Sequence, residues 1–306
     1  MKLHARASSN SVIKMIMSNA NGIGESKRES KAQSDLVGQN GQSVSSKAHS
    51  ISSTQNLRTV TTQYTNFIKD NYGGRVVKNM NSETIKEFIR YKIEEDKLSL
   101  SSANTYISEL GKISDNLNQL GVNSTLREEI TNYRTELKES YGSLQSKKVD
   151  RTNSNPVAII KEMNNTSPFG LSSQLQLEAG LRVGDATDMS KISINNDNSL
   201  TIHGSKNGLT YTTAPISNNL RDRVAEAKEN GYKVAYSEYR ESLKEATETT
   251  NQEYKGTHSL RYDFANHAHS ENLKNGISSE DSKLEISLKM GHSREEITEH
   301  YLKSNK

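Results

Sequence analysis

The sequence of 306 residues contains no cysteine and no tryptophan, and it contains only three prolines. Without cysteine the chain has no disulfide, no thiolate metal site and no cysteine nucleophile, which fits a reducing compartment such as the cytoplasm. Hydrophobic residues make up only 31% of the chain, and the mean hydropathy is -0.83. No stretch reaches the roughly 18 apolar residues of a membrane span, and the apolar run near the N-terminus is short and broken by Lys14. We therefore expect a cytoplasmic protein without a membrane partner, built from small helical cores.

The first half of the chain shows apolar residues at helical spacing. From Thr54 to Leu144 they recur three or four residues apart in four segments, and Gly73 and Gly121 end the first and the third of these. Four amphipathic helices with short connections predict a small helical bundle over residues 54–145. The stretch that follows, S-K-K-V-D-R-T-N-S-N over residues 146–155, is polar and basic and is predicted to be a linker between two domains.

The second half predicts helices around a small sheet. Pro156 and the pair Ser167-Pro168 are typical first residues of helices. After them, K-I-S-I, S-L-T-I-H and G-L-T-Y-T-T alternate with Asn- and Gly-rich turns, as three short antiparallel strands would. Ser217 is a typical cap for a further helix. The predicted fold class is therefore mainly α with a small antiparallel β-sheet, and residues 156–306 form the second domain.

Residues that can transfer a phosphoryl group gather near the C-terminus. His258 and Arg261 lie three residues apart, so on a helix their side chains share one face. His292 precedes Tyr301 by nine residues, and the S-x-x-E that begins at Ser293 predicts a helix start, with Tyr301 about two turns inside the helix. Arginine neutralises a phosphate with a two-pronged fork, histidine moves protons near neutral pH, and tyrosine supplies a nucleophilic oxygen. This set is what phosphoryl transfer to a tyrosine hydroxyl requires.

These motifs resemble those of the tyrosine site-specific recombinases, the phage integrase family. The resemblance rests on H-S-L-R, on G-H-x8-Y near the C-terminus, and on L-E-A-G-L-R-V-G-D upstream, and the three pieces stand in the family's order. It implies that residues 54–145 are a core-binding, SAM-like DNA-binding domain and residues 156–306 a mixed α+β catalytic domain. The chain departs from the family at Tyr262, where relatives carry a second histidine, and in a longer interval between Arg261 and His292.

The resemblance also implies roles for the charged residues and the tyrosine. Arg182 and Arg261 would clamp the phosphate, on which negative charge builds during attack. Tyr301 would be the nucleophile. Lys206, the only lysine in the predicted hairpin turn G-S-K-N-G, would protonate the leaving 5′ oxygen.

Two histidines and an acid complete the implied set. His258 would hydrogen-bond the phosphate and move a proton, His292 would donate to a phosphate oxygen, and Asp185 would orient an arginine or a histidine. We expect no cofactor and no metal. The sequence has no G-x-x-x-x-G-K-[ST] loop for ATP, and the H-x-H of His267 and His269 lacks a nearby third metal ligand.

The implied function is that of a recombinase or integrase, which cuts and rejoins double-stranded DNA at specific core sites through a 3′-phosphotyrosyl intermediate. The chain would be associated with the nucleoid and would act as a homotetramer on synapsed DNA. Two alternatives stay open. One is a DNA-relaxing enzyme like the type IB topoisomerases, which uses the same chemistry without synapsis. The other is a non-catalytic DNA-binding accessory protein.

Residues 1–53 differ from the rest in composition and charge. The net charge of the chain is +3, and residues 1–50 hold seven Lys and Arg against three Asp and Glu, so the remainder carries a net -1. The segment is dominated by Ser, Asn, Gly, Gln and Lys, and it cannot bury enough apolar surface to offset its ordering entropy. It is predicted to be a flexible basic tail, either free in solution or an arm that touches DNA or a neighbouring subunit.

Overall fold

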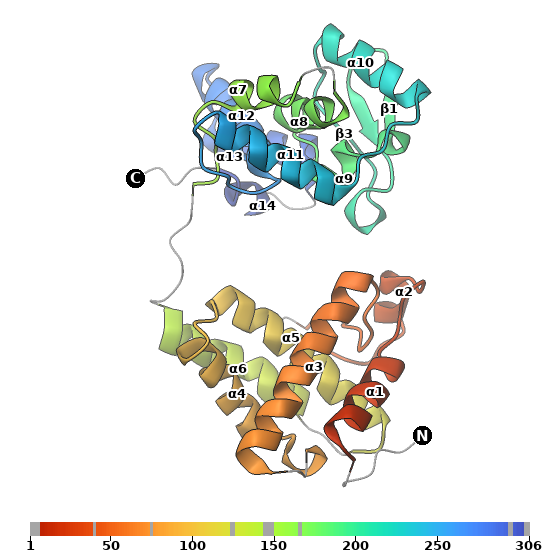
Figure 1. Ribbon diagram of the computed structural model, residues 1–306, viewed down its shortest axis with the longest axis vertical. Helices are drawn as coiled ribbons and strands as arrows, with labels where there is room; N and C mark the ends of the chain where they lie inside the picture. The colour runs from red at the N-terminus through yellow and green to blue at the C-terminus, as the bar shows by residue number, and fades with distance from the viewer. Residues whose placement is uncertain are drawn as a thin grey trace. The chain divides into compact units, whose positions relative to one another are not determined.

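Figure 1 shows the chain as a computed structural model, which describes residues 7–38, 41–73, 76–122, 126–142, 150–164, 167–292 and 296–302. The chain divides into two compact units, unit 1 over residues 1–147 and unit 2 over residues 148–306. The described part is mainly helical with a three-stranded antiparallel sheet, so the predicted fold class is confirmed. None of the described helices is long and apolar enough to cross a lipid bilayer.

Unit 1 is a bundle of helices around one hydrophobic core. Its elements are α1 (Ser9–Asn19), α2 (Lys27–Ala32), α3 (Ile51–Tyr72), the 3-10 helix η1 (Val77–Asn79), α4 (Ser82–Glu94), α5 (Leu100–Gln119) and α6 (Leu126–Tyr141). The four amphipathic helices that the sequence predicts are α3 to α6. Side-chain oxygens of Ser50, Asn81 and Ser99 cap α3, α4 and α5, which explains where these helices begin.

The N-terminal segment folds onto this bundle instead of forming a flexible tail. Helix α1 packs on α3 and α5 and buries Val12 and Ile16 completely. The prediction for residues 1–53 is therefore wrong over the residues of this segment that the structure describes. A helix of 11 residues is marginal in isolation, but burial of its apolar face against a folded bundle stabilises it. Average composition conceals such a short apolar face.

Polar contacts fix the end of α1 to α5. The side-chain amide of Asn19 donates to Oδ1 of Asn116 and to Oε1 of Gln119, both at 2.7 Å. Asn116 in turn donates to the carbonyl of Ser46 at 3.0 Å. The turn after α1 and the segment before α3 are thus held by the same two side chains of α5.

Unit 2 places helices around a small sheet. Its elements are α7 (Pro156–Glu162), α8 (Pro168–Ala179), α9 (Val183–Ala186), η3 (Met189–Lys191), β1 (Ile192–Ile194), β2 (Leu200–Ile202), η4 (Lys206–Gly208), β3 (Tyr211–Thr212), α10 (Asn218–Glu229), α11 (Tyr236–Thr249), α12 (Ser259–Lys274), α13 (Ser279–Lys289) and α14 (Glu296–Glu299). The strands pair in the order β1-β2-β3, with Ile192 opposite Ile202 and Ile202 opposite Tyr211. The predicted strands and the predicted helix starts at Pro156 and Pro168 are confirmed.

The core of unit 2 is divided into small clusters. One joins the sheet to α8 and α10, a second joins α7 to α11, and a third joins α12 to α13. Gly180 ends α8 with a φ of 63°, and a side chain there would meet the ring of Phe264 on α12 at 2.5 Å. Glycine is required at this position by the backbone and by the close packing of α8 on α12.

Residues 150–155, which we call the strap, belong to unit 2. The backbone N–H and the side-chain amide of Asn153 donate to the carboxylate of Asp263 on α12, at 2.8 and 2.6 Å. Thr152 and Asn153 are both buried. The prediction of a linker over residues 146–155 is therefore wrong for the strap, and residues 146–149 lie outside the described residues.

Candidate active site

Arg261 is the centre of the site and is completely buried in the first turn of α12. One terminal nitrogen donates to the carbonyl of Gly180, and the other donates to the carbonyl of Met290 and to Nε2 of His292, both at 2.8 Å. Its Nε has no hydrogen-bond partner among the described residues. Burial lowers the pKa of Arg261, but a guanidinium keeps its proton in proteins. The site is therefore built around a buried positive charge.

His292 is a neutral ring that orients Arg261. Because an arginine can only donate, Nε2 of His292 accepts the hydrogen bond, and the ring proton is on Nδ1, which donates to Oγ1 of Thr298 at 3.1 Å. Burial, with the nearby charges of Arg261 and Arg182, lowers the pKa of His292 to about 3. The resemblance implies that His292 donates to a phosphate oxygen, whereas in this arrangement its Nε2 is an acceptor.

Arg182 precedes α9 and connects the turn between β2 and β3 to the backbone after α13. One terminal nitrogen donates to the carbonyl of Gly291 at 2.7 Å, and the other donates to Oγ of Ser205 at 3.1 Å. Ser205 donates to Oδ2 of the buried Asp185 at 2.6 Å, and this oxygen lies 4.0 Å from Arg182. Ser205 is a site residue that the sequence analysis missed. Its only signal was its place beside Lys206 in the hairpin turn.

Both arginines bind the backbone directly after α13. Arg261 and Arg182 donate to the consecutive carbonyls of Met290 and Gly291. The carbonyl end of a helix carries a partial negative charge, which stabilises nearby cations. Two guanidinium groups carry more positive charge than this helix end offsets, so the arrangement favours an anionic ligand.

His258 and Lys206 complete the set of predicted cationic or proton-moving groups. His258 precedes the first residue of α12, and burial together with the charges of Arg261, Arg182, Arg151 and Lys206 lowers its pKa to about 4. Its Nδ1 is buried without a partner in the described part of the chain. Lys206 is exposed in η4, and it makes no hydrogen bond or ion pair with another described residue.

Tyr301 packs against Arg261 and His292. Its ring centre lies 5.3 Å from the guanidinium carbon of Arg261, and its ring stacks on that of His292 with centroids 5.2 Å apart. The prediction that Tyr301 lies two turns inside a helix is wrong, because α14 is four residues long and ends before it. The carbonyl of Tyr301 accepts from the side-chain amide of Asn266 on α12 at 2.6 Å. The predicted cap, Ser293, lies outside the described residues.

Two further tyrosines adjoin the site. The ring of Tyr262 has its centroid 4.5 Å from that of Tyr301, and the ring of Tyr211 lies 5.7 Å from the guanidinium carbon of Arg182. The hydroxyl of Tyr211 is buried without a partner among the described residues, and burial raises its pKa. Buried polar atoms without partners are rare in folded proteins and often mark functional sites. The strand pattern predicted the position of Tyr211 but not its contact with Arg182.

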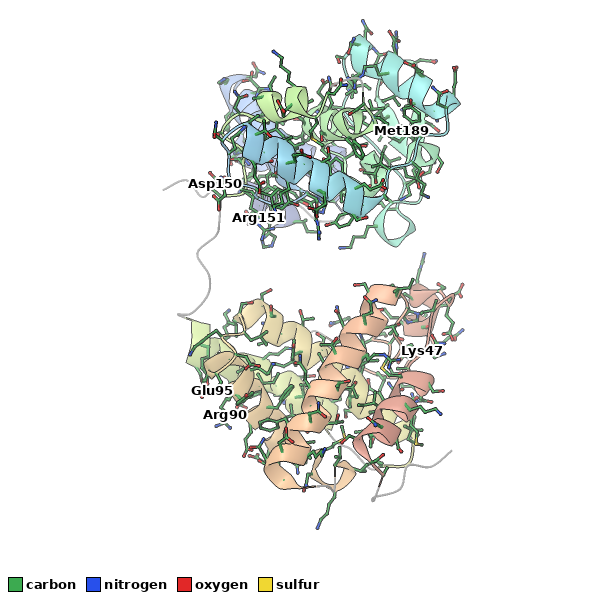
Figure 2. The ribbon with its side chains drawn as sticks, viewed as in Figure 1. Lys47, Arg90, Glu95, Asp150, Arg151 and Met189 are labelled. Carbon is green, nitrogen blue, oxygen red and sulfur yellow. The ribbon has the colours of Figure 1, made fainter. Side chains whose placement is uncertain are left out.

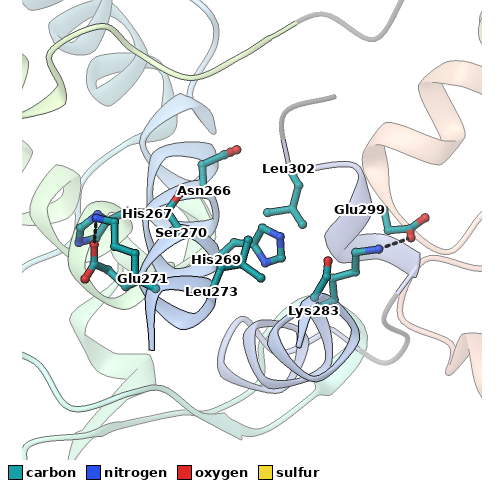
Figure 3. A pocket seen from close by; sticks show the side chains of 11 residues that line it. Asn266, His267, His269, Ser270, Glu271, Leu273, Lys283, Glu299 and Leu302 are labelled. Atoms are coloured by element: carbon teal, nitrogen blue, oxygen red, sulfur yellow. Dashed lines mark hydrogen bonds and ion pairs between the residues drawn. The ribbon is translucent and has the colours of Figure 1, made fainter. Parts of the chain in front are cut away.

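A surface cavity lies between α12, α13 and α14 (Figure 3). His267 and His269 both line it but point to different sides of α12, as residues two apart on a helix do. Nδ1 of His269 pairs with Oγ of Ser282 at 2.8 Å, and Lys283 pairs with Glu299 at 3.0 Å. Within the described ranges, no three His, Asp or Glu side chains are arranged to hold a metal ion.

No protein-family model matches the sequence, and no curated protein matches it. The structure does match solved structures. A crystal structure of a lambda integrase(75-356) dimer bound to a COC′ core site covers 82% of this chain and 88% of its own, with a TM-score of 0.56 and 18% sequence identity. A lambda integrase tetramer bound to a Holliday junction covers 84% of this chain and 73% of its own, with a TM-score of 0.55 and 15% identity.

The chain has the lambda integrase fold. Unit 2 makes up about half of the chain, so a match over 82% extends into unit 1. The resemblance to the tyrosine recombinases, which rests on three short motifs, is thereby confirmed at the level of the fold.

Proposed function

We propose that the chain is a DNA strand transferase of the tyrosine recombinase type. The observation that carries the proposal is the convergence of Arg182, Arg261, His292 and Tyr301 on the end of α13, in a site where positive charge exceeds negative charge. These residues come from stretches far apart in the sequence, and their contacts are direct. In this proposal unit 2 is the catalytic domain and unit 1 is a DNA-binding domain.

The reaction is a pair of transesterifications. The phenolic oxygen of Tyr301 attacks the phosphorus of a backbone phosphate, the bond from phosphorus to the 5′ oxygen breaks, and a 3′-phosphotyrosyl link forms. The leaving 5′ oxygen takes a proton from Lys206, which is exposed in its turn. A 5′ hydroxyl of a second strand then attacks the phosphotyrosyl link and releases Tyr301. The link conserves the energy of the phosphodiester bond.

Arg261 and Arg182 stabilise the charge that builds on the phosphate oxygens during attack. Arg261 suits this role because its guanidinium is fixed by two carbonyls and His292 before substrate arrives. His258 is neutral near pH 7 and can accept the proton of Tyr301. A bound phosphate offsets the cations that lower the pKa of His258, so it raises that pKa toward the useful range.

The partners in this proposal are double-stranded DNA with specific core sites and further copies of the chain in a homotetramer. The two matching lambda integrase structures hold a core site and a Holliday junction, the second as a tetramer. Exchange of strands between two duplexes requires four cleavages, which a tetramer with one Tyr301 in each subunit supplies.

The test uses a duplex whose sequence is selected by binding from a randomised pool and is then nicked near the cleavage position. Loss of the short fragment beyond the nick prevents rejoining, so the covalent complex accumulates and is counted on a denaturing gel. We expect Tyr301→Phe to abolish the complex while DNA affinity changes by less than about threefold, because the ring is kept. Tyr262→Phe is the matched control, since its ring is the neighbour of Tyr301, and it should still form the complex.

If the complex survives in Tyr301→Phe and disappears in Tyr262→Phe, the nucleophile is Tyr262, and the proposal names the wrong tyrosine. Formation of Holliday junctions from two duplexes by the wild-type chain tests the tetramer. Relaxation of supercoiled DNA without junctions would instead favour a topoisomerase.

A further inference from the structure

Arg151 belongs to the strap (Figure 2), and its guanidinium lies over the ring of Tyr262, which is the neighbour of Tyr301. Its guanidinium carbon lies 5.9 Å from the ring centre of Tyr262, whose centroid is 4.5 Å from that of Tyr301. The guanidinium is therefore no farther from the ring of Tyr301 than the sum of these two distances. Arg151 is exposed, and none of the described carboxylates forms an ion pair with it. Its charge is also one of those that lower the pKa of His258.

The strap is held at consecutive positions around Arg151. Oδ1 of Asp150 accepts from the backbone N–H and the hydroxyl of Thr152, at 2.9 and 2.7 Å, which closes a turn with Arg151 at its tip. The next residue, Asn153, is fixed to Asp263 on α12 by two hydrogen bonds. A segment that only joins two units needs no such anchoring. The contacts instead fix the backbone of Arg151 relative to the helix whose first turn forms the centre of the site.

The face of Tyr262 supports the guanidinium of Arg151. A guanidinium over an aromatic ring is held by a cation–π contact and still presents its N–H groups to a ligand at its edge. Such a fork matches the geometry of a phosphate. The arrangement therefore offers a pre-positioned phosphate-binding group outside the cluster of Arg182 and Arg261.

We propose that Arg151 positions the DNA by binding a backbone phosphate that flanks the phosphate attacked by Tyr301. The proposal rests on the proposed function. The attacked phosphate is taken by Arg182 and Arg261, so Arg151 binds a different one. Phosphates of one strand follow each other at about 3.4 Å along the helix axis, so a neighbour one to three positions away is within reach. A contact of this kind fixes the register of the DNA without reading its sequence.

The experiment combines variants with neutral phosphates. The variants are Arg151→Met, which keeps an apolar stem, and Arg151→Lys, which keeps the charge. Arg221→Ala removes a half-buried arginine of α10 that pairs with Asp222 and donates to Asn198, and serves as the control. Each is measured on nicked duplexes in which one phosphate, at each of three positions on either side of the attacked phosphate, is replaced by an uncharged methylphosphonate. Equilibrium affinity and the rate of covalent complex formation are measured for every combination of protein variant and duplex.

We expect Arg151→Met to weaken affinity, or slow complex formation, by about 10- to 100-fold, the effect of losing one charge-assisted hydrogen bond. The slope of log K against log salt should fall by about one unit, while Arg221→Ala leaves it unchanged. At one position, the methylphosphonate should weaken binding by the wild type as much as the Arg151→Met substitution does. The same methylphosphonate should weaken binding by Arg151→Met by less than about a further threefold, because the contact is already lost. Arg151→Lys should restore the salt slope.

Two results would overturn the proposal. One is an Arg151→Met effect that adds fully to every methylphosphonate. The other is a salt slope equal to that of the wild type, which would mean that Arg151 only packs on Tyr262. The affinity measurements need no cleavage. If the wild-type chain forms no covalent complex, the proposed function fails, and the methylphosphonate pattern in affinity still decides for or against Arg151.

Discussion

Replacing Gly180 with alanine tests whether the close approach of α8 to α12 holds the candidate site together. Gly180 has a φ of 63°, and an added Cβ would lie 2.5 Å from the ring of Phe264. A left-handed backbone costs about 1–2 kcal/mol for a residue with a side chain, and overpacking of this kind costs about 1–3 kcal/mol. We therefore expect Gly180→Ala to lower the free energy of unfolding of unit 2 by about 2–5 kcal/mol.

Two controls separate the causes of this loss. Gly204 has nearly the same backbone, with a φ of 59°, but no atom lies within 4 Å of an added Cβ. Gly204→Ala should therefore cost only the backbone term of about 1–2 kcal/mol. Phe264→Leu removes much of the ring that the new methyl group meets. The double variant should lose less stability than the sum of the losses in the two single variants, because the smaller side chain at position 264 relieves the clash with the new methyl group.

The assay is urea unfolding of the full chain, followed by circular dichroism, together with formation of the covalent complex. The carbonyl of Gly180 accepts from Arg261, so displacement of α8 from α12 should slow complex formation more than it weakens DNA binding. Equal losses for Gly180→Ala and Gly204→Ala would refute the reasoning. They would mean that α8 and α12 separate freely to admit the methyl group.

Three further predictions concern unit 1, the histidines and the lysine. Ile16→Ala, at a fully buried position of α1, should destabilise unit 1 by about 2–5 kcal/mol. Ile23→Ala, at a position 52% exposed, should change stability by less than about 0.5 kcal/mol, and equal effects would favour a loosely attached segment. His258 and His292 have folded pKa values of about 4 and about 3, below the ordinary 6.5, so protonation favours the unfolded chain. Stability in urea should therefore fall as the pH drops from about 6.5 toward 4, and His292→Gln should flatten this decline. Lys206→Ala should slow cleavage of ordinary DNA but be largely rescued by sulfur at the leaving 5′ position, since a thiolate leaves without a proton; no rescue would remove the general-acid role.

The elements of both units could be predicted largely from local patterns. Helices α3 to α6 follow from apolar spacing and from caps such as Asn81, and the strands follow from alternation and turn residues. Arg261 and His292 were found because their spacings to His258 and Tyr301 are local and chemically specific. In these cases the information lies within a few residues of the feature that it predicts.

The missed features depend on partners far away in the sequence. The burial of Ile16 depends on faces of α3 and α5, and the strap depends on a contact between Asn153 and Asp263, 110 residues apart. Composition classified both segments as polar and unstructured, because each contributes only a few side chains to a contact whose other half lies elsewhere. Ser205 was missed for a related reason, since a serine in a turn acquires a role only when Asp185 and Arg182 meet there.

The protonation of His292 shows why the roles of site residues need the fold as well as the motif. On the motif alone, a histidine near a phosphate can be an acid, a base or a donor. In the fold, Arg261 has carbonyls as its other acceptors and can only donate, so His292 must accept and must be neutral. In the proposed function, a phosphate bound by Arg261 would compete with His292 for one N–H group, while the two carbonyls would keep the guanidinium in place. Substrate binding would then free Nε2 of His292, and the nearby anion would ease its protonation, so that the ring would become the donor that the motif implies.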